Sequence, residues 1–256
     1  MSIKKDRVVI ANWKMKLGLA ESVALAKSYG EVFKDFKGSV VACPGAFALS
    51  QVAKTLKGSP IKVGAQNVFW EDKGAYTGEI PASVLTEIGC EYVIIGHSER
   101  RQYLLENYEM IHQKIKTVLN TKQLIPVVCI GENMEERKTD RRDFVLAHQL
   151  QQALGGINFL SGQQIIIAYE PIWAIGSGTA IEPSEAEYAH RVIKQTIKDI
   201  FGLPDIMSHF KIIYGGSVSS KIVKDFVGLE DIDGLLVGGA SLDANEFYKV
   251  AKAMLK

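Results

Sequence analysis

The sequence predicts an α/β protein, a (β/α)8 barrel in which helices surround eight parallel strands. Short apolar segments rich in β-branched residues alternate along the chain with longer amphipathic segments. This alternation is typical of parallel strands joined by helices that cover both faces of the sheet. The chain also has 256 residues, which is close to the length of one complete barrel.

The expected strands are the short apolar runs, and their order along the chain defines eight strand–helix units. The strands lie at residues 8–11, 40–43, 61–65, 92–95, 125–130, 165–169, 211–214 and 234–237. Helical patterns lie between or after them, as at residues 22–36, 110–119, 144–154, 184–200 and 245–255. The helix at residues 184–200 is expected to begin with Ser184 as a capping residue, followed by Glu185.

An open, doubly wound sheet has the same alternation of strands and helices, so a second observation must separate the two. The sequence contains no Gly-x-Gly-x-x-Gly after the first strand and no Gly-x-x-x-x-Gly-Lys-Ser/Thr anywhere. Those are the phosphate loops of nucleotide-binding open sheets. The barrel is therefore favoured, and because no linker or composition shift divides the chain, we expect a single domain over residues 1–256.

Composition excludes several classes of function. The chain has 30 basic and 29 acidic residues, a formal net charge of +1, which argues against a nucleic-acid-binding surface. No apolar run is long enough for a membrane helix, and the first residues lack the apolar stretch of a secretory signal. Three widely spaced cysteines, Cys43, Cys90 and Cys129, are typical of free buried thiols in a reducing compartment. We therefore expect a cytoplasmic protein with no membrane or nucleic-acid partner.

One segment combines a buried strand end with a carboxylate and a glycine-rich stretch. The apolar run at residues 165–168 leads to Glu170, Pro171 then restricts the backbone, and Gly-Ser-Gly follows at 176–178. A carboxylate at the end of a buried strand is costly unless it is paired or used in chemistry. The segment therefore predicts a base and a cover that shields it from water.

Polar residues and glycines also follow four other expected strands. They are Asn12-Trp13-Lys14, the segment from Gly96 through His97, Ser98 and Glu99 to Arg101, Gly215-Gly216-Ser217, and Gly238-Gly239-Ala240-Ser241. Taken singly, each has an ordinary structural explanation: a surface lysine, a hydrogen-bonding histidine, a tight glycine turn. Because all these strand ends meet at one mouth of a barrel, their combination favours a functional site.

The residue types at this mouth indicate a chemistry. The two glycine turns leave backbone N–H groups for a phosphate, and Lys14 supplies a positive charge. Glu170 can accept a proton from carbon, and His97 can donate a hydrogen bond to a carbonyl oxygen that becomes an enediolate. No metal-binding cluster or cofactor motif is apparent in the sequence. We therefore expect cofactor-free proton transfer next to the carbonyl of a phosphorylated substrate.

The combination and order of these motifs resemble the triosephosphate isomerase family over the whole chain. The matching segments are residues 12–14, 64–67, 96–101, 168–176, 214–218 and 236–242. The resemblance implies an aldose–ketose isomerase that interconverts dihydroxyacetone phosphate and D-glyceraldehyde 3-phosphate through an enediolate, with no cofactor and no metal. Membership would also place the protein in glycolysis and gluconeogenesis.

The resemblance further implies a role for each matching residue. Glu170 would be the base and His97 the electrophile, in the neutral form that is a known feature of this family. Lys14 and Asn12 would bind substrate and stabilise the developing charge. The phosphate would be bound mainly by backbone N–H groups of four residues, Gly176, Ser217, Gly238 and Gly239. Glu99 would support Lys14 without touching the substrate.

The resemblance also implies a homodimer formed through a long loop at residues 67–79. In the family this loop inserts into the partner subunit near its active site, where it would support the partner's Asn12 and Lys14. Val68-Phe69-Trp70 is an apolar stretch in this loop that is expected to be exposed, and exposed apolar surface often marks an interface. The alternative is a loop that folds back on its own barrel.

Two segments depart from the family pattern, and two other functions stay open. Thr179-Ala180-Ile181 ends the glycine-rich segment in an unusual way, and residues 104–108 are atypical in a manner expected to affect local packing. The chain could be another phosphate-binding (β/α)8 isomerase, which the histidine motif and the Glu-Pro-Ile-Trp segment argue against. It could also be a non-catalytic barrel scaffold, which the joint presence of Lys14, His97 and Glu170 argues against.

Overall fold

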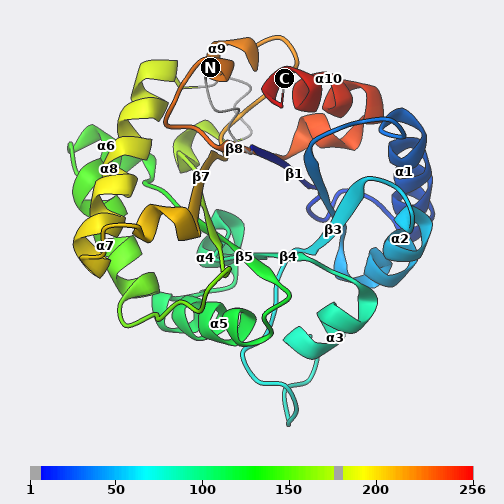
Figure 1. Ribbon diagram of the computed structural model, residues 1–256, viewed down its shortest axis with the longest axis horizontal. Coiled ribbons are helices and arrows are strands. Elements are labelled where there is room, and N and C mark those ends of the chain that lie inside the picture. The colour runs from blue at the N-terminus through cyan, green and yellow to red at the C-terminus, as the bar shows by residue number, and fades with distance from the viewer. Residues whose placement is uncertain (1–6, 176–180, 256) are drawn as a thin grey trace.

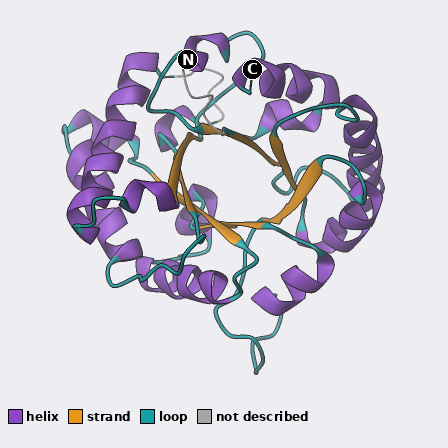
Figure 2. Cartoon of the chain, viewed as in Figure 1, coloured by secondary structure: helices purple, strands orange, loops and turns teal. Residues whose placement is uncertain are grey.

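The computed structural model describes residues 7–175 and 181–255 and has the architecture of a closed barrel of parallel strands surrounded by helices (Figures 1 and 2). The strands follow one another around the barrel in sequence order, and the last strand pairs with the first to close it. The prediction of a (β/α)8 barrel is confirmed.

The observed strands lie where the apolar runs predict them. They are β1 (Val8–Asn12), β2 (Ser39–Cys43), β3 (Ile61–Ala65), β4 (Tyr92–Ile95), β5 (Ile125–Ile130), β6 (Ile165–Tyr169), β7 (Phe210–Tyr214) and β8 (Gly234–Val237). Strands β1, β2 and β7 are each one residue longer than predicted. In β1 the extra residue is Asn12, which pairs with Cys43 of β2, so backbone pairing carries the strand past the end of its apolar run.

Helices form the outer layer, in the segments that separate the strands. The α-helices are α1 (Leu19–Val32), α2 (Leu49–Leu56), α3 (Ala82–Ile88), α4 (Ser98–Tyr103), α5 (Tyr108–Asn120), α6 (Met134–Lys138), α7 (Arg142–Leu154), α8 (Pro183–Phe201), α9 (Lys224–Val227) and α10 (Ala244–Met254). Four short 3-10 turns within the described residues are η1 (Ala46–Ala48), η2 (Ile172–Ala174), η3 (Ile206–His209) and η4 (Gly239–Leu242).

The expected capped start of helix α8 at Ser184 is wrong. The helix begins one residue earlier, at Pro183, after Glu182 in the capping position, and no side chain caps it. Proline is favoured at the first helical position because its φ angle is already helical and its missing N–H would have no partner there. The proline therefore determines this boundary, and Ser184 lies inside the first turn.

Alternate residues of each strand enter two different apolar clusters. In β1, Val8 and Ile10 belong to a cluster formed by strand residues, which fills the barrel interior. Their neighbours Val9 and Ala11 belong to the larger cluster that the strands form with the surrounding helices. Because successive side chains of a strand point to opposite faces, a continuously apolar strand is buried on both sides. This explains why the strands read as uninterrupted apolar runs.

An aromatic cluster joins the end of β1 to the segment after β8. The Trp13 indole donates a hydrogen bond to the Tyr29 hydroxyl at 3.4 Å, and that hydroxyl donates to the Ser241 carbonyl oxygen at 2.6 Å. The ring of Tyr29 stacks on Phe247 of α10, with 5.2 Å between the ring centres. These contacts hold the strand ends that carry Lys14 and Gly238 close to each other.

Three further observations bear on the expectations from composition. Cys43, Cys90 and Cys129 are free and buried, as predicted. Within the described ranges, no helix combines the length and the apolar character needed to cross a membrane. The apolar stretch in the long loop differs from expectation, because Val68 is fully buried and its neighbours Phe69 and Trp70 are partly buried.

A buried histidine on α8 makes the stability of the fold depend on pH. The Nδ1 atom of His190 lies 3.1 Å from the Asp231 carbonyl oxygen, and its Nε2 atom has no hydrogen-bond partner among the described residues. Burial lowers the pKa of His190 to about 4. In the unfolded chain the imidazole titrates near 6.5, so between these values the unfolded chain binds a proton that the folded chain does not. Stability is therefore lost as the pH falls through this range.

We predict that His190→Gln removes part of this acid sensitivity. At pH 5 the wild-type histidine should have lost about 2 kcal/mol of its contribution to the free energy of unfolding. Urea unfolding at pH 7 and pH 5, at one protein concentration, gives the loss for each protein. The decrease in the free energy of unfolding from pH 7 to pH 5 should be about 2 kcal/mol smaller in the variant than in the wild type. The same pH dependence in both proteins would contradict the assignment.

Candidate active site

The carboxyl ends of β1, β4, β6, β7 and β8 surround a cavity of about 450 Å³. Its walls include the residues that the sequence singles out after these strands: Asn12, Lys14, His97, Glu99, Glu170, Ser217, Gly238 and Gly239. The structure therefore brings these eight residues together. The ninth, Gly176, lies outside the described residues, as do Ser177, Gly178, Thr179 and Ala180.

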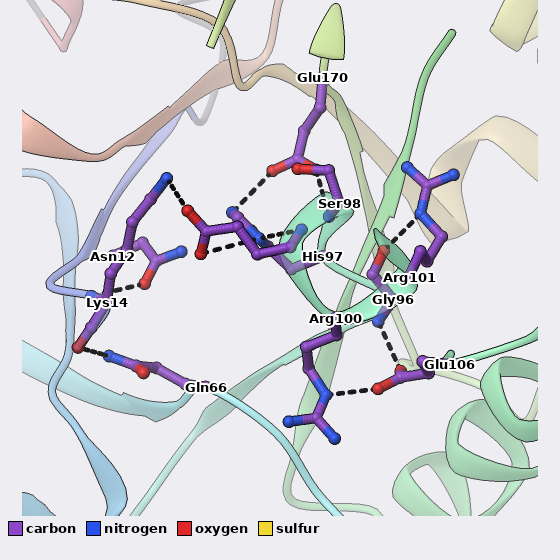
Figure 3. A network of polar contacts seen from close by, with 11 residues as sticks. Asn12, Lys14, Gln66, Gly96, His97, Ser98, Arg100, Arg101, Glu106 and Glu170 are labelled. Carbon is purple, nitrogen blue, oxygen red and sulfur yellow. Dashed lines mark hydrogen bonds and ion pairs between the residues drawn. The ribbon is translucent and has the colours of Figure 1, made fainter. Parts of the chain in front are cut away.

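The end of β1 places Lys14 by means of two side-chain amides (Figure 3). The Asn12 side-chain oxygen accepts a hydrogen bond from the Lys14 backbone N–H at 3.0 Å. The Gln66 amide donates to the carbonyl oxygens of Lys14 and Cys43, each at 2.9 Å. Lys14 has a left-handed backbone with φ of 51°, which costs a residue with a side chain about 1–2 kcal/mol. The hydrogen bonds to both sides of this residue hold it there.

The Lys14 side chain is aimed by Glu99 and lies over the turn after β8. Its ammonium nitrogen is 2.7 Å from a Glu99 carboxylate oxygen. A Cβ atom at Gly238 would be 3.4 Å from the Lys14 Cε atom, so the lysine stem packs directly on that glycine. Because nearly half of the Glu99 side chain is exposed, the pair contributes little to stability. Its effect is to direct the ammonium group into the cavity.

Gly96, the residue before His97, is held at both of its backbone polar atoms. The Gly96 N–H donates to a Glu106 carboxylate oxygen at 3.0 Å, and the Arg101 Nε donates to the Gly96 carbonyl oxygen at 3.0 Å. Gly96 has a φ of 69°, and a Cβ atom there would lie 2.7 Å from the Ile111 side chain. A glycine is therefore required at this position, and the turn that carries His97 packs directly against α5.

Hydrogen bonds to the two ring nitrogens of His97 define its protonation. Its Nδ1 atom accepts a hydrogen bond from the Glu99 backbone N–H at 3.2 Å, and its Nε2 atom lies 3.1 Å from a carboxylate oxygen of Glu170. A ring nitrogen that accepts from a backbone N–H carries no proton, so the proton is on Nε2. This arrangement directs the Nε2–H at Glu170 on the cavity wall, and a carboxylate oxygen of Glu99 also lies 3.5 Å from Nδ1.

Glu170 is 1% exposed, and both of its carboxylate oxygens have partners (Figure 3). One oxygen accepts from His97, and the other accepts from the Ser98 backbone N–H at 3.0 Å. Burial and the negative charge of Glu170 raise the pKa of the Cys129 thiol well above its usual value, so the thiol stays protonated beside the carboxylate. The site therefore holds the ionisable side chains of Glu170 and His97 in contact with each other.

In the segments after β5 and β7, two positions have neighbours so close that only glycine fits. A Cβ atom at Gly131 would lie 1.8 Å from the Glu170 carbonyl oxygen, and one at Gly216 would lie 2.0 Å from the Tyr214 hydroxyl. The Gly215 N–H donates to the Tyr169 carbonyl oxygen at 2.8 Å. The glycines after β7 therefore bring the backbone around Ser217 to the edge of the cavity beside Glu170.

Sequence reasoning missed three residues that support this site. The Ser98 backbone N–H, the Glu106 carboxylate and the Arg101 guanidinium each hold Glu170 or the turn of His97. A backbone donor leaves no signal in the sequence. Glu106 belongs to the atypical stretch at residues 104–108, in which Leu104 and Leu105 are 61% and 79% exposed whereas Glu106 itself is buried.

Comparison with known proteins agrees with the geometry of the site. The family model described as triosephosphate isomerase matches residues 7–254. A triosephosphate isomerase of Dictyoglomus turgidum is 40% identical over 97% of this chain and 100% of its own length. Those of Caldanaerobacter subterraneus subsp. tengcongensis and Clostridium botulinum are each 43% identical, over 95% and 96% of this chain and 97% and 98% of their own lengths. The chain therefore belongs to the triosephosphate isomerase family and, with it, to the isomerases.

Proposed function

We propose that this protein interconverts dihydroxyacetone phosphate and D-glyceraldehyde 3-phosphate through an enediolate, with Glu170 as the base and neutral His97 as the electrophile. One observation carries the proposal most directly. The Glu170 carboxylate and the His97 N–H lie 3.1 Å apart on the wall of one cavity, and both side chains are buried. A proton acceptor and a hydrogen-bond donor are therefore available to adjacent atoms of one small substrate.

Glu170 carries the proton from one carbon of the substrate to the next. Glu170 removes a proton from the carbon next to the carbonyl group, and electrons move onto the carbonyl oxygen. His97 donates a hydrogen bond from Nε2 to that oxygen as its negative charge develops. The hydroxyl proton on the neighbouring oxygen passes to that first oxygen by way of His97 Nε2, and the protonated Glu170 returns its proton to the former carbonyl carbon, so that the neighbouring oxygen becomes the new carbonyl. Water must be kept out during these steps, since the enediolate could otherwise lose phosphate.

The same proposal assigns the remaining residues of the cavity. The Lys14 ammonium group binds the substrate and balances its negative charge, and Asn12 holds the lysine backbone and contacts the substrate. Backbone N–H groups of Ser217, Gly238 and Gly239 bind the phosphate, together with Gly176. The support is that Lys14 packs on Gly238, so its charge is next to the backbone that would hold the dianion.

We also propose that the protein is a homodimer in which the loop at residues 67–79 contacts the partner. This loop projects from the barrel between β3 and α3 (Figure 1). Its base is anchored on α5, because the Lys114 ammonium donates to the Asn67 side chain and the Thr117 hydroxyl donates to the Trp70 carbonyl oxygen, each at 2.8 Å. A loop that leaves its own barrel with a firm base is suited to insertion into a second subunit.

Exposed apolar side chains in the loops after β1, β2 and β4 supply a surface that such a partner would cover. Met15 is 90% exposed and immediately follows Lys14, and Phe47 is 58% exposed in the turn after β2. Leu105 is 79% exposed and has a left-handed backbone with φ of 55°. We propose that the partner subunit covers these exposed side chains.

Two further expectations stand as proposals of the same kind. The three buried free thiols support a reducing location, the cytoplasm. Pairing between β1 and β8 supports a single domain, because the first and last parts of the chain complete one barrel.

We predict that Glu170→Gln lowers kcat by about 10³-fold or more, because the amide keeps the shape of the side chain but cannot accept the proton. Turnover of glyceraldehyde 3-phosphate is measured with a coupled dehydrogenase that consumes the dihydroxyacetone phosphate formed. Glu91→Gln is the matched control, since Glu91 is paired with Lys62 away from the cavity. A Glu170→Gln protein with half of wild-type turnover would rule out Glu170 as the base. A wild-type protein inactive on both trioses but active on another phosphorylated sugar would favour a different barrel isomerase.

Lys14 should act through its charge. We predict that Lys14→Met weakens binding of glycerol 3-phosphate, a substrate-like phosphate, by about 2–3 kcal/mol. Lys14→Arg keeps the charge with a different shape, so it should retain part of the affinity. Isothermal titration measures both. Equal affinity in the wild type and in Lys14→Met would remove the lysine from the binding site.

Assembly should be needed for full activity. We predict that deletion of residues 72–75, at the tip of the projecting loop, produces monomers with weak turnover, because the partner's Asn12 and Lys14 lose their support. Analytical ultracentrifugation gives the mass, and the coupled assay gives the rate on the same sample. A monomer as active as the wild type would refute the link between assembly and activity.

A further inference from the structure

A cluster of polar and aromatic side chains lies behind the turn that follows Glu170. The Trp173 indole donates a hydrogen bond to a Glu132 carboxylate oxygen at 2.8 Å, and the Tyr169 hydroxyl donates to the same oxygen at 3.1 Å. The Ile172 backbone N–H also donates to the Glu132 carbonyl oxygen at 3.0 Å. Glu132 is completely buried, and burial raises its pKa. The turn η2 is thus tied to the end of β5 along one edge of the Trp173 ring.

Arg137 covers the face of the same ring. Its guanidinium carbon lies 4.5 Å from the centre of the Trp173 ring, within the range of an attractive cation–π contact. Its Nη2 atom donates to a carboxylate oxygen of Glu185. About three quarters of the Arg137 side chain is buried, and cation–π contacts are stronger when water is excluded from them.

These contacts join three elements that are separate in the sequence. Arg137 belongs to the short helix α6, Trp173 to the turn η2, and Glu185 to the first turn of α8. A carboxylate in the first turn of a helix is favoured by the helix dipole. The dipole therefore stabilises Glu185 at this position, where it accepts a hydrogen bond from Arg137. Arg137 thereby connects the residues just after Glu170 to the start of the next helix.

We propose that Arg137 is a positioning residue for Glu170, acting through Trp173, and this rests on the proposed role of Glu170 as the base. Only Pro171 and Ile172 separate Glu170 from Trp173 in the chain. Glu132 holds one edge of the tryptophan ring, and Arg137 holds its face. Removal of Arg137 leaves the ring free to shift and the turn with it. Small displacements of a reacting group are costly in catalysis.

The ion pair with Glu185 is the less important of the two contacts of Arg137. Nearly two fifths of the Glu185 side chain is exposed, and exposed pairs contribute little. The stacking on Trp173 is the contact that connects Arg137 to Glu170. The two contacts therefore make different predictions for variants of Glu185 and Trp173.

The first experiment separates the rate of the chemical step from substrate binding. Arg137→Met keeps much of the apolar stem but removes the charge, and we expect kcat to fall about tenfold with KM within about twofold of wild type. Affinity for glycerol 3-phosphate should not change. Arg137→Lys, which keeps a cation over the ring, should recover most of the lost kcat.

Two controls and a double-mutant cycle identify the route. Lys62 also combines a cation–ring contact, with Tyr92, and an ion pair, with Glu91, so Lys62→Met should leave kcat unchanged. Glu185→Gln should lower kcat by less than about twofold. In a Trp173→Phe background, Arg137→Met should lower kcat much less than in wild type, because the contact between Arg137 and the ring of residue 173 is already altered.

Three outcomes would overturn the proposal. They are an unchanged kcat in a folded Arg137→Met protein, a fall in kcat of the same size with and without Trp173, and a parallel loss of glycerol 3-phosphate affinity. If Arg137→Met does not fold, Arg137→Gln carries the same predictions. Failure of the proposed function is distinguished by Glu170→Gln, which would then retain turnover. Failure of this inference alone leaves Glu170→Gln inactive and the Arg137 variants active.

Discussion

Burial of the Glu170 carboxylate at the end of an apolar strand is the constraint on which the rest of the site depends. An ionised carboxylate without partners in such a place would be very costly, and the chain meets the cost with the Ser98 backbone N–H and the His97 ring, at 3.0 and 3.1 Å. Both partners come from the turn after β4, whereas Glu170 follows β6. The two strands are separated by β5 in the closed barrel, so the pairing exists only when the barrel is complete.

The same turn supports the neutral state proposed for His97. Helix α4 begins at Ser98, and its first N–H groups have no partners within the helix. One of them, at Glu99, donates to the Nδ1 atom of His97, and another, at Ser98, donates to Glu170. One helix start thus holds both the Glu170 carboxylate and the His97 ring. The same two N–H groups find their hydrogen-bond partners and fix the two side chains of the proposed chemistry in contact with each other.

The fold and the positions of the chemistry could be read from the sequence because each has a local pattern. Apolar β-branched runs located all eight strands, and polar residues after those runs located Lys14, His97 and Glu170 in one cavity. What could not be read depends on contacts distant in the chain. The stack of Arg137 on Trp173 and the burial of Val68 are examples. The start of α8 was misplaced for the opposite reason, since the proline at its first position outweighed the serine that follows it.

A buried ion network connects the proposed dimer loop to the turn of His97 within one subunit. Although burial opposes ionisation of Glu106, the neighbouring Lys114 and Arg100 lower the pKa of that carboxyl. The carboxylate accepts from the Gly96 N–H, which precedes His97, and Lys114 also holds Asn67 at the base of the loop. Breaking a buried pair by removing one partner is costly, because an uncompensated charge remains. The loop base and the histidine turn of one subunit are therefore held by the same set of charges.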